Sequence, residues 1–183
     1  DMVQIFAAAV PPKAAPYSVH VKIETGMGRL GVRPPEMPDL AAMPAFRATL
    51  RLEGLMTHLA DADNTKTTHT EKQLTEFQQT LDTLRQGGLS CPLIHAANSA
   101  GIIQYPASLY TLVRPGIMLY GYHTLSNETP APELRPILTW KATIAHLHNI
   151  QAGDSVSYNR TFIAARRSKI AVLPVGYADG YNR

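Results

Sequence analysis

The sequence predicts an α/β fold in which short strands alternate with helices, followed by a segment made of strands. Two observations support this. Four short apolar runs are separated by segments with helical character, which is the order expected of βα units around a parallel sheet. Beyond the proline-rich segment 123–136, apolar residues from Leu138 to Ile150 alternate with a period of two, so the chain becomes all-β there.

The first predicted strand, Ser18–Ile23, leads directly into a glycine-rich turn that carries Arg29. Its β-branched alternation favours a strand, and Gly26 and Gly28 allow backbone angles that other residues resist. Barrels and open α/β sheets carry out their chemistry at the C-terminal ends of strands. Arg29 is therefore a candidate for binding an anion, although an ordinary turn after a strand would look similar.

The remaining elements of the α/β part follow in order. Further strands are predicted at Arg51–Thr57, Cys91–His95 and Thr111–Val113, with Met118–Tyr120 as a continuation of the last. Helices are predicted over 38–49 and over 69–85, where apolar residues recur at helical spacing and two glycines provide the stop. Asn98 or Ser99 would cap a helix through Gln104, whose first-turn N–H groups are suited to a phosphate.

The second part of the chain follows a predicted linker over 123–136, which contains Asn127 and three prolines. Strands are predicted at Leu138–Ile150, Ser155–Tyr158 and Ile170–Val175, with a turn at 151–154. We place the domain boundary between residues 133 and 134. Too few strands follow it to close a β domain.

Composition excludes several classes of function. Of the 183 residues, 45% are hydrophobic and 17% charged, and no apolar run approaches the ~20 residues of a membrane helix. The net charge of +3 comes from scattered Lys and Arg, which favours a small anionic ligand over nucleic acid. The single cysteine excludes an internal disulfide, has no zinc-ligand spacing, and suits a reducing, cytoplasmic compartment. The N-terminus lacks signal-peptide features and resembles an internal cut.

Six motifs in this order resemble alanine racemase: His20–Val32, Leu52–Ala60, His95–Ala100, Val113–Gly121, Val156–Tyr158 and Val175–Gly180. The resemblance covers nearly the whole chain and is weakest near 123–136. It implies the second half of a pyridoxal-phosphate-binding (β/α)8 TIM-type barrel, followed by the start of a mostly β C-terminal domain. It also implies an isomerase, a homodimer whose active sites share residues, and an amino acid as the small-molecule substrate. The product D-alanine would supply peptidoglycan for the cell wall.

The resemblance assigns proton transfer to Tyr158, as the base on one face of the substrate α-carbon. A phenol with a pKa near 10 is a poor base at neutral pH, so it needs cationic help. His58 matches the histidine that supplies this help and contacts the arginine beneath the cofactor ring. Without the motifs, packing in the core or on the surface is the commoner role of a single Tyr or His.

Arg114 matches the arginine that hydrogen-bonds the pyridine nitrogen. A guanidinium stays protonated, so it cannot give the ring a proton. This weakens the cofactor as an electron sink and limits side reactions such as transamination. The alternative is that Arg114 merely ends a strand.

Four residues match the phosphate cradle of the family. They are Ser99, the backbone N–H groups of Gly116 and Ile117, and Asn98 as a shaping residue. A helix start, a hydroxyl and a glycine turn can hold a dianion without a lysine. For Ser99 alone, an ordinary helix cap is the alternative.

The resemblance also assigns the glycine turn and the substrate entrance. Arg29 matches the arginine near the cofactor's phenolic oxygen and the substrate carboxylate. Lys22 matches a lysine that many family members carry as a carbamate, which would pair with Arg29 where a plain lysine would repel it. A plain snorkelling lysine stays an alternative. Tyr177 matches a gate tyrosine at the substrate entrance.

The lysine that forms the Schiff base with pyridoxal 5'-phosphate lies in a family motif absent from these residues, so we expect this chain to be inactive alone. The implied reaction is two-base proton transfer on a pyridoxal-phosphate aldimine, which interconverts L- and D-alanine. Two alternatives remain open. One is a broad-spectrum or serine racemase of the same superfamily, and the other is a non-catalytic cofactor-carrier or scaffold fragment.

Overall fold

A computed structural model describes residues 5, 8–9, 16–126 and 130–182. The chain forms two compact units, residues 1–137 and 138–183, each described here by itself. The predicted domain boundary at 133/134 stays a prediction. The predicted linker includes Asn127, which lies outside the described residues.

The first unit is built on a parallel sheet of three strands in the order β1-β2-β3. These strands are β1 (Tyr17–Lys22), β2 (Leu50–Met56) and β3 (Leu93–His95). Their register pairs Lys22 with Met56 and Met56 with His95. The C-terminal ends of all three strands therefore meet at one edge, and the predicted parallel arrangement is confirmed.

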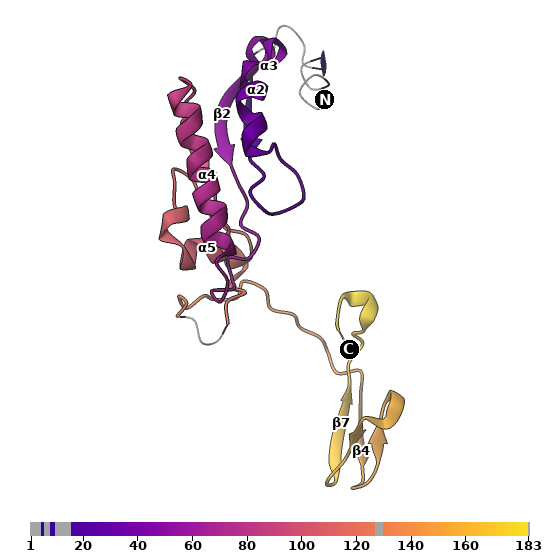
Figure 1. The fold of residues 1–183 in the computed structure, drawn as a ribbon. Helices are drawn as coiled ribbons and strands as arrows, with labels where there is room; N and C mark the ends of the chain where they lie inside the picture. The colour runs from indigo at the N-terminus through magenta and orange to yellow at the C-terminus, as the bar shows by residue number, and fades with distance from the viewer. Residues whose placement is uncertain (1–4, 6–7, 10–15, 127–129, 183) are drawn as a thin grey trace. The chain divides into compact units, whose positions relative to one another are not determined.

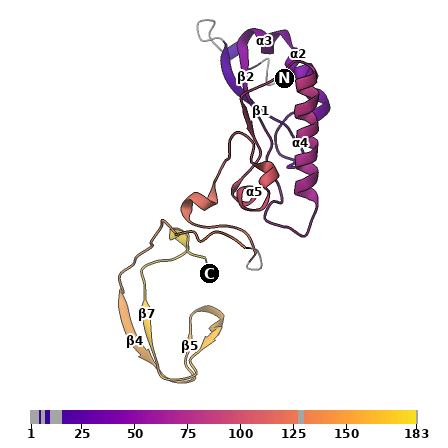
Figure 2. The same ribbon diagram turned by 90° about the vertical axis from the view of Figure 1, so that its left-hand side faces the viewer.

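Helix α4 (His69–Gln86) provides most of the cover for this sheet and lies beside β2 in Figures 1 and 2. Its buried positions recur every three or four residues, and Phe77 is 0% exposed, packed edge-to-face on Tyr110. The helix ends at Gly87, so the prediction for 69–85 is confirmed. The core contains apolar residues from the sheet, from the segments that follow β1 and β2, and from α4: Ile23, Leu55, Leu59, Leu74, Phe77, Leu81, Leu84 and Ile94.

The single helix predicted over 38–49 is wrong, because the structure has two. Helix α2 (Met37–Ala42) and helix α3 (Pro44–Thr49) are separated at Met43, which has φ −57° and ψ 128°. A residue before proline is pushed out of the helical region by the proline ring, and Met43 precedes Pro44. A 3₁₀ turn, Pro34–Glu36, leads into α2.

The strand predicted at Thr111–Val113 is also wrong, as is its continuation over 118–120. Thr111 is joined to β3 through Ile94 alone: its N–H donates to the Ile94 carbonyl at 3.0 Å, and its Oγ1 accepts from the Ile94 N–H at 2.7 Å. A ladder does not continue, because the Leu112 N–H also donates to the Ile94 carbonyl, at 3.2 Å, and the next N–H to bond is that of Arg114, to the Ala97 carbonyl at 3.0 Å. Residues Ile117–Tyr120 form a 3₁₀ helix instead.

Helix α5 (Ser99–Gln104) follows the prediction, with Asn98 as its cap. The Asn98 Oδ1 accepts from the Gly101 N–H at 2.9 Å, which satisfies a backbone donor of the first turn. A 3₁₀ turn, Pro106–Ser108, comes next. No helix among the described residues combines the length and apolar character needed to cross a membrane.

The second unit consists of two antiparallel strand pairs. Strand β4 (His146–Ile150) pairs with β7 (Ser168–Val172), and β5 (Ser155–Val156) pairs with β6 (Phe162–Ile163). Short 3₁₀ turns, Tyr158–Arg160 and Tyr177–Asp179, follow β5 and β7.

The predicted all-β character is confirmed here, but three strand limits are wrong. Only residues 146–150 of the strand predicted over 138–150 form a ladder. Strand β7 pairs with them from Val172, opposite His146, to Ser168, opposite Ile150, and no strand partner is described for residues 138–144. Positive φ at Ser157 and Asn159 ends β5 before Tyr158. The strand predicted at 170–175 is shifted to 168–172 by its register with β4. The turn at 151–154 is confirmed.

The glycine turn after β1 closes back on the strand. The Val32 N–H donates to the Lys22 carbonyl at 2.8 Å, and the Glu24 N–H donates to the Val32 carbonyl at 2.8 Å. Gly31 lies at the closing point with φ +135°, and a Cβ there would lie 2.9 Å from the Lys22 carbonyl oxygen. Gly28 has φ +68° and open space around it.

We predict that Gly31→Ala costs more stability than Gly28→Ala in the full-length protein that carries this chain. At Gly31 a side chain meets both a forbidden φ and a backbone clash, so we expect a loss of about 3 kcal/mol in the free energy of unfolding. Gly28→Ala, the control, adopts the left-handed region at about 1 kcal/mol. Urea unfolding measures both, and equal losses would contradict the closed turn.

Candidate active site

A cavity of about 390 Å³ lies in the first unit beyond the C-terminal ends of β2 and β3. Six of the residues predicted from the sequence line it: His58, Asn98, Ser99, Arg114, Gly116 and Ile117. Its size falls in the range of small-molecule sites. The parallel register brings His58, Asn98 and Ser99 together, since they follow strands β2 and β3, which end at the same edge. Arg114, Gly116 and Ile117 follow no strand, and the Arg114 N–H joins their segment to the chain after β3 by donating to the Ala97 carbonyl at 3.0 Å.

Arg114 is held by acceptors from two strand ends. Its Nη2 donates to the Thr57 carbonyl at 2.7 Å and to the Ala96 carbonyl at 3.0 Å, and its Nη1 contacts His95 Nδ1 at 2.6 Å. Burial lowers the pKa of this guanidinium from its ordinary value. Within the described part of the chain, its Nε–H and one Nη1–H have no partner, so they are available to a ligand.

His95 completes the support of Arg114 from below. Because a guanidinium only donates, the Nδ1 of His95 must accept, and the neutral ring carries its proton on Nε2. That Nε2 lies 2.7 Å from His20 Nδ1, which must then accept in turn. Burial, Arg114 and His20 lower the pKa of His95 to about 4. The hydrogen bonds therefore run in one direction, from Arg114 to His95 as acceptor and from His95 to His20.

His20 reaches His95 across a glycine on the strand between them. Gly54 of β2 pairs with His20 in the register, and a Cβ at Gly54 would lie 2.6 Å from the His20 ring. The Nε2 of His20, on the far side of its ring, lies 4.0 Å from a Glu53 carboxylate oxygen. A side chain at position 54 would thus displace His20 from His95.

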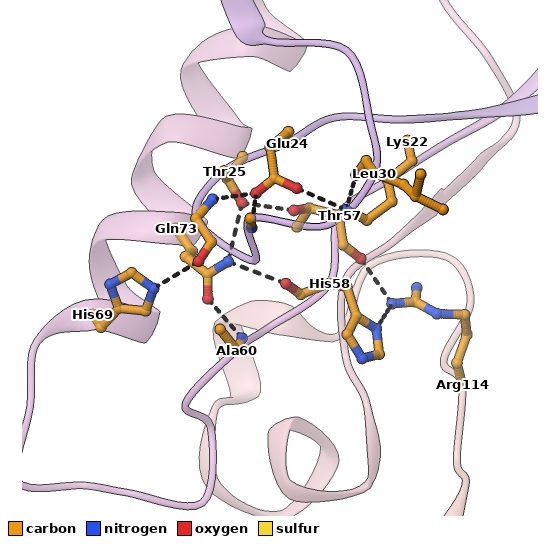
Figure 3. Close-up of polar contacts among 12 residues, drawn as sticks. Lys22, Glu24, Thr25, Leu30, Thr57, His58, Ala60, His69, Gln73 and Arg114 are labelled. Carbon is orange, nitrogen blue, oxygen red and sulfur yellow. Dashed lines mark hydrogen bonds and ion pairs between the residues drawn. The ribbon is translucent and has the colours of Figure 1, made fainter. Parts of the chain in front are cut away.

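His58 also contacts Arg114, and Figure 3 shows the ring beside the guanidinium. Its Nδ1 lies 3.2 Å from Arg114 Nη2. Both hydrogens of Nη2 are directed at the Thr57 and Ala96 carbonyls, so His58 Nδ1 is a third, shared acceptor beside them and faces a group that can only donate. Burial lowers the pKa of His58, and the cations Arg114, Arg29 and Lys22 lower it further. The ring is therefore neutral near pH 7 and holds its proton on Nε2, where it can donate to another group.

Ser99 joins the start of α5 to the turn after Arg114. Its Oγ accepts from the Gly116 N–H at 2.8 Å and from the Met118 N–H at 3.3 Å. Two accepted hydrogen bonds use both lone pairs, so the hydroxyl hydrogen is left to donate. Asn98 is fixed beside it, since its Nδ2 donates to the Leu59 carbonyl at 3.1 Å.

Glu24 organises the glycine turn and pairs with Lys22 (Figure 3). Its Oε1 accepts from the N–H groups of Gly26 at 2.8 Å and Gly28 at 2.9 Å, and its Oε2 lies 3.1 Å from Lys22 Nζ. Lys22 also donates to the Leu30 carbonyl. Burial acts to raise the pKa of Glu24, but these hydrogen bonds and Lys22 outweigh it and lower the pKa to about 2. The charge of Lys22 is thus balanced by Glu24, and carbamylation of Lys22 stays a prediction.

The other predicted residues lie apart from the cavity lining. Arg29 is exposed on the glycine turn, and no hydrogen-bond or ion-pair partner for it is found among the described residues. Tyr158 and Tyr177 belong to the second unit, where they are 76% and 67% exposed. Their roles stay predictions.

Four residues around the site were missed by the sequence analysis: His20, Glu24, Gln73 and His95. A weak signal existed for three of them. His20 and Lys22 are two apart on a strand and so share a face, Glu24 begins the glycine turn, and His95 ends a strand. Gln73 gave no signal, since a single polar residue among the apolar positions of a helix has many explanations.

Family models match both parts of the chain. The alanine racemase N-terminal domain matches residues 1–124, and the alanine racemase C-terminal domain matches residues 137–183.

Curated relatives are similar over most of this chain. The alanine racemase of Halothermothrix orenii is 44% identical over 165 residues, which cover 90% of this chain and 44% of that protein. The alanine racemase of Desulforamulus reducens is 38% identical over 187 residues, which cover 100% of this chain and 50% of that protein. The chain thus spans about half the length of the curated relatives it matches.

Solved structures give the same result. An alanine racemase of Clostridium difficile 630 matches with a TM-score of 0.81 and 32% identity, over 100% of this chain and 48% of that one. The biosynthetic alanine racemase of Pseudomonas aeruginosa matches with a TM-score of 0.79 and 34% identity, over 99% of this chain and 49% of that one. An alanine racemase of Bartonella henselae with covalently bound pyridoxal phosphate matches with a TM-score of 0.78 and 28% identity, over 99% of this chain and 48% of that one.

The lowered pKa of His95 predicts a loss of stability in mild acid. The unfolded chain binds a proton at His95 near pH 6.5, whereas the folded protein does so near pH 4. The unfolded state binds more protons in this window, so the free energy of unfolding falls as the pH falls from 6.5 to 4, by up to about 3 kcal/mol. Urea titrations at a series of pH values measure this slope.

His95→Gln should remove this part of the slope, because glutamine does not titrate. The matched control is His148→Gln, which replaces an exposed histidine of β4 and should leave the slope unchanged. An identical slope in His95→Gln and the parent protein would show that His95 is not held neutral by Arg114.

Proposed function

The chain belongs to the alanine racemase family, and on this basis we propose that it supplies the cofactor-binding part of an enzyme that interconverts L- and D-alanine. The observation that carries the proposal is the cavity in which Arg114, His58 and Ser99 converge. The fold expected of the family, a TIM-type barrel followed by a β domain, agrees with parallel βα units followed by antiparallel strands.

Pyridoxal phosphate fits the hydrogen-bonding groups of this cavity. The lining offers a free hydroxyl hydrogen on Ser99, the second Nδ2–H of Asn98 and the N–H of Ile117, which suit a phosphate dianion. The Gly116 N–H, expected from the sequence to bind the phosphate, donates to Ser99 Oγ instead. Arg114 keeps donors that suit an acceptor such as a ring nitrogen. When bound, the cofactor supplies an electron sink that makes the α-hydrogen of an amino acid acidic.

Arg114 would keep the ring nitrogen unprotonated. It has no proton that it can release at working pH, and its Nη groups are already fixed by the Thr57 and Ala96 carbonyls and by His95. His95 cannot pass a proton to Arg114, because the His95 Nδ1 that faces Arg114 is an acceptor. We infer that this arrangement restrains charge build-up on the ring and so favours racemisation over transamination.

Tyr158 and His58 would divide the proton transfer between them. Tyr158 would take the proton from the α-carbon of L-alanine as a phenolate. Because His58 is neutral, it would stabilise this phenolate by donating its Nε2–H, and the cationic help expected of it from the sequence is not available. The exposed position of Tyr158 suits a role in the cavity of a second copy, so we propose a homodimer with shared active sites. Tyr177 serves as a gate at the entrance.

Arg29 would bind the substrate carboxylate, since its guanidinium is exposed and unpaired within the described residues. Carbamylation of Lys22 stays a prediction, and it would break the ion pair between Lys22 and Glu24. A carbamate on Nζ would replace the ion pair with Glu24 by repulsion between two anions, so Glu24 would have to turn away.

We propose that the full-length protein acts in the cytoplasm and supplies D-alanine for peptidoglycan. A broad-spectrum or serine racemase is the neighbouring possibility. A non-catalytic carrier is not favoured, because the second unit and Tyr158 belong to the racemase pattern.

The first test is racemisation by the full-length protein with pyridoxal phosphate, followed as D-alanine formation from L-alanine. Tyr158→Phe should lower the L-to-D rate by about 100-fold or more, since a general base is lost. The control, Tyr122→Phe, changes a tyrosine of the first unit outside the cavity lining and should keep the parent rate. Absence of alanine racemisation in a protein that binds the cofactor would refute the proposed function.

The second test concerns the phosphate. Ser99→Ala should weaken pyridoxal phosphate binding by about tenfold or more, because a hydrogen bond to a charged group is lost. The control is Ser90→Ala, at an exposed serine before β3. Absorbance titration gives both dissociation constants, and equal values would remove Ser99 from the cradle.

A further inference from the structure

Gln73 is a buried amide from α4 that reaches the loop carrying His58. Its side chain is 0% exposed. Its Oε1 accepts from the Ala60 N–H at 2.9 Å, and its Nε2 donates to the His58 carbonyl at 3.0 Å and to Thr25 Oγ1 at 3.3 Å. Figure 3 shows this side chain between the glycine turn and the His58 loop.

The loop after β2 needs these hydrogen bonds. The ladder with β3 ends where the Thr57 N–H donates to the His95 carbonyl at 3.1 Å. Beyond that point the His58 carbonyl and the Ala60 N–H turn toward α4, where Gln73 offers one donor and one acceptor in a single plane. The amide acts as a neighbouring strand would, and satisfies backbone groups that are costly to leave unpaired.

The same amide is connected to the glycine turn. Thr25, which precedes Gly26, is 6% exposed, and its Oγ1 lies 2.6 Å from the Oγ1 of Thr57, which is 1% exposed. Gln73 bonds to this threonine pair through Thr25. One side chain thus ties α4 to the ends of both β1 and β2.

We propose that Gln73 is a positioning residue of the active site, which fixes the His58 backbone and, through Thr25, the turn that carries Arg29. The proposal rests on the proposed function. His58 contacts Arg114 at 3.2 Å from its side chain, so a shift of its backbone changes that contact. Three cations face His58, from three different segments: Arg114, Arg29 and Lys22.

Another buried polar residue of the helix behaves differently. The Thr80 hydroxyl, 5% exposed on α4, donates to the Glu76 carbonyl of its own helix at 2.8 Å. Its removal disturbs the helix interior without reaching the loop. Thr80→Val is therefore a matched control for a buried hydrogen bond lost on α4.

The test compares Gln73→Met with Thr80→Val in the full-length protein, labelled at histidine and at backbone amides for NMR. Methionine has a similar length and no donor or strong acceptor. We expect Gln73→Met to raise the pKa of His58 toward its ordinary value, because the ring moves away from Arg114 and gains solvent. Exchange of the Ala60 amide should accelerate about tenfold or more, and kcat should fall about tenfold. Thr80→Val should change none of these readouts.

A pKa of His58 that stays at the parent value while the Ala60 amide exchanges faster would overturn the proposal, because the hydrogen bond would then be structural alone. If Gln73→Met does not fold, Gln73→Asn replaces it. It keeps the amide but is one methylene too short to reach Ala60 and Thr25 together. The pKa of His58 and the exchange rate of the Ala60 amide then decide as they do for Gln73→Met. The His58 titration needs no turnover, so a protein without racemase activity would refute the proposed function and leave this test intact.

Discussion

A cation without a carboxylate partner must be stabilised by neutral acceptors when it is taken out of water, and Arg114 is such a cation. Within the described residues it forms no ion pair; two backbone carbonyls and two histidine nitrogens surround it instead. The carbonyls of Thr57 and Ala96 come from different strands. They converge because the parallel register places Met56 beside His95. The binding of Arg114 therefore depends on the pairing of β2 with β3.

The same requirement determines the protonation of the histidines. A guanidinium can only donate, so His95 and His58 both present an unprotonated Nδ1 to it, and each carries its proton on Nε2. The His95 proton is directed to His20, away from the cavity. The His58 proton is left for another group. One cation therefore divides two chemically equal side chains into a supporting residue and a donor at the cavity.

The glycine turn obeys a separate constraint, and Glu24 satisfies it. Its carboxylate accepts hydrogen bonds from two backbone N–H groups and pairs with Lys22, which orders the turn and balances the charge of Lys22. Arg29, on the same turn, is exposed and has no hydrogen-bond or ion-pair partner among the residues that the structure describes. Glu24 lies two residues from Lys22 and pairs with it at 3.1 Å, while carbamylation of Lys22 stays a prediction.

The sequence by itself determined the order of the elements and six of the residues around the cavity. Alternation in 18–23, helical spacing in 69–85 and the cap at Asn98 are local properties, so they could be read without the fold. The break at Met43 is also a local property, because Pro44 can be seen in the sequence. The prediction of a single helix over 38–49 did not take it into account. The failure at Thr111–Val113 was not local, because a strand exists only where a neighbour can pair with it. Tertiary structure decided that Gln73, which gave no signal in the sequence, and His20 and Glu24, which gave a weak one, support the site. Their roles depend on distances between segments far apart in the chain or on the closing of a turn, and hydrogen bonds of that kind leave no periodic pattern in a sequence.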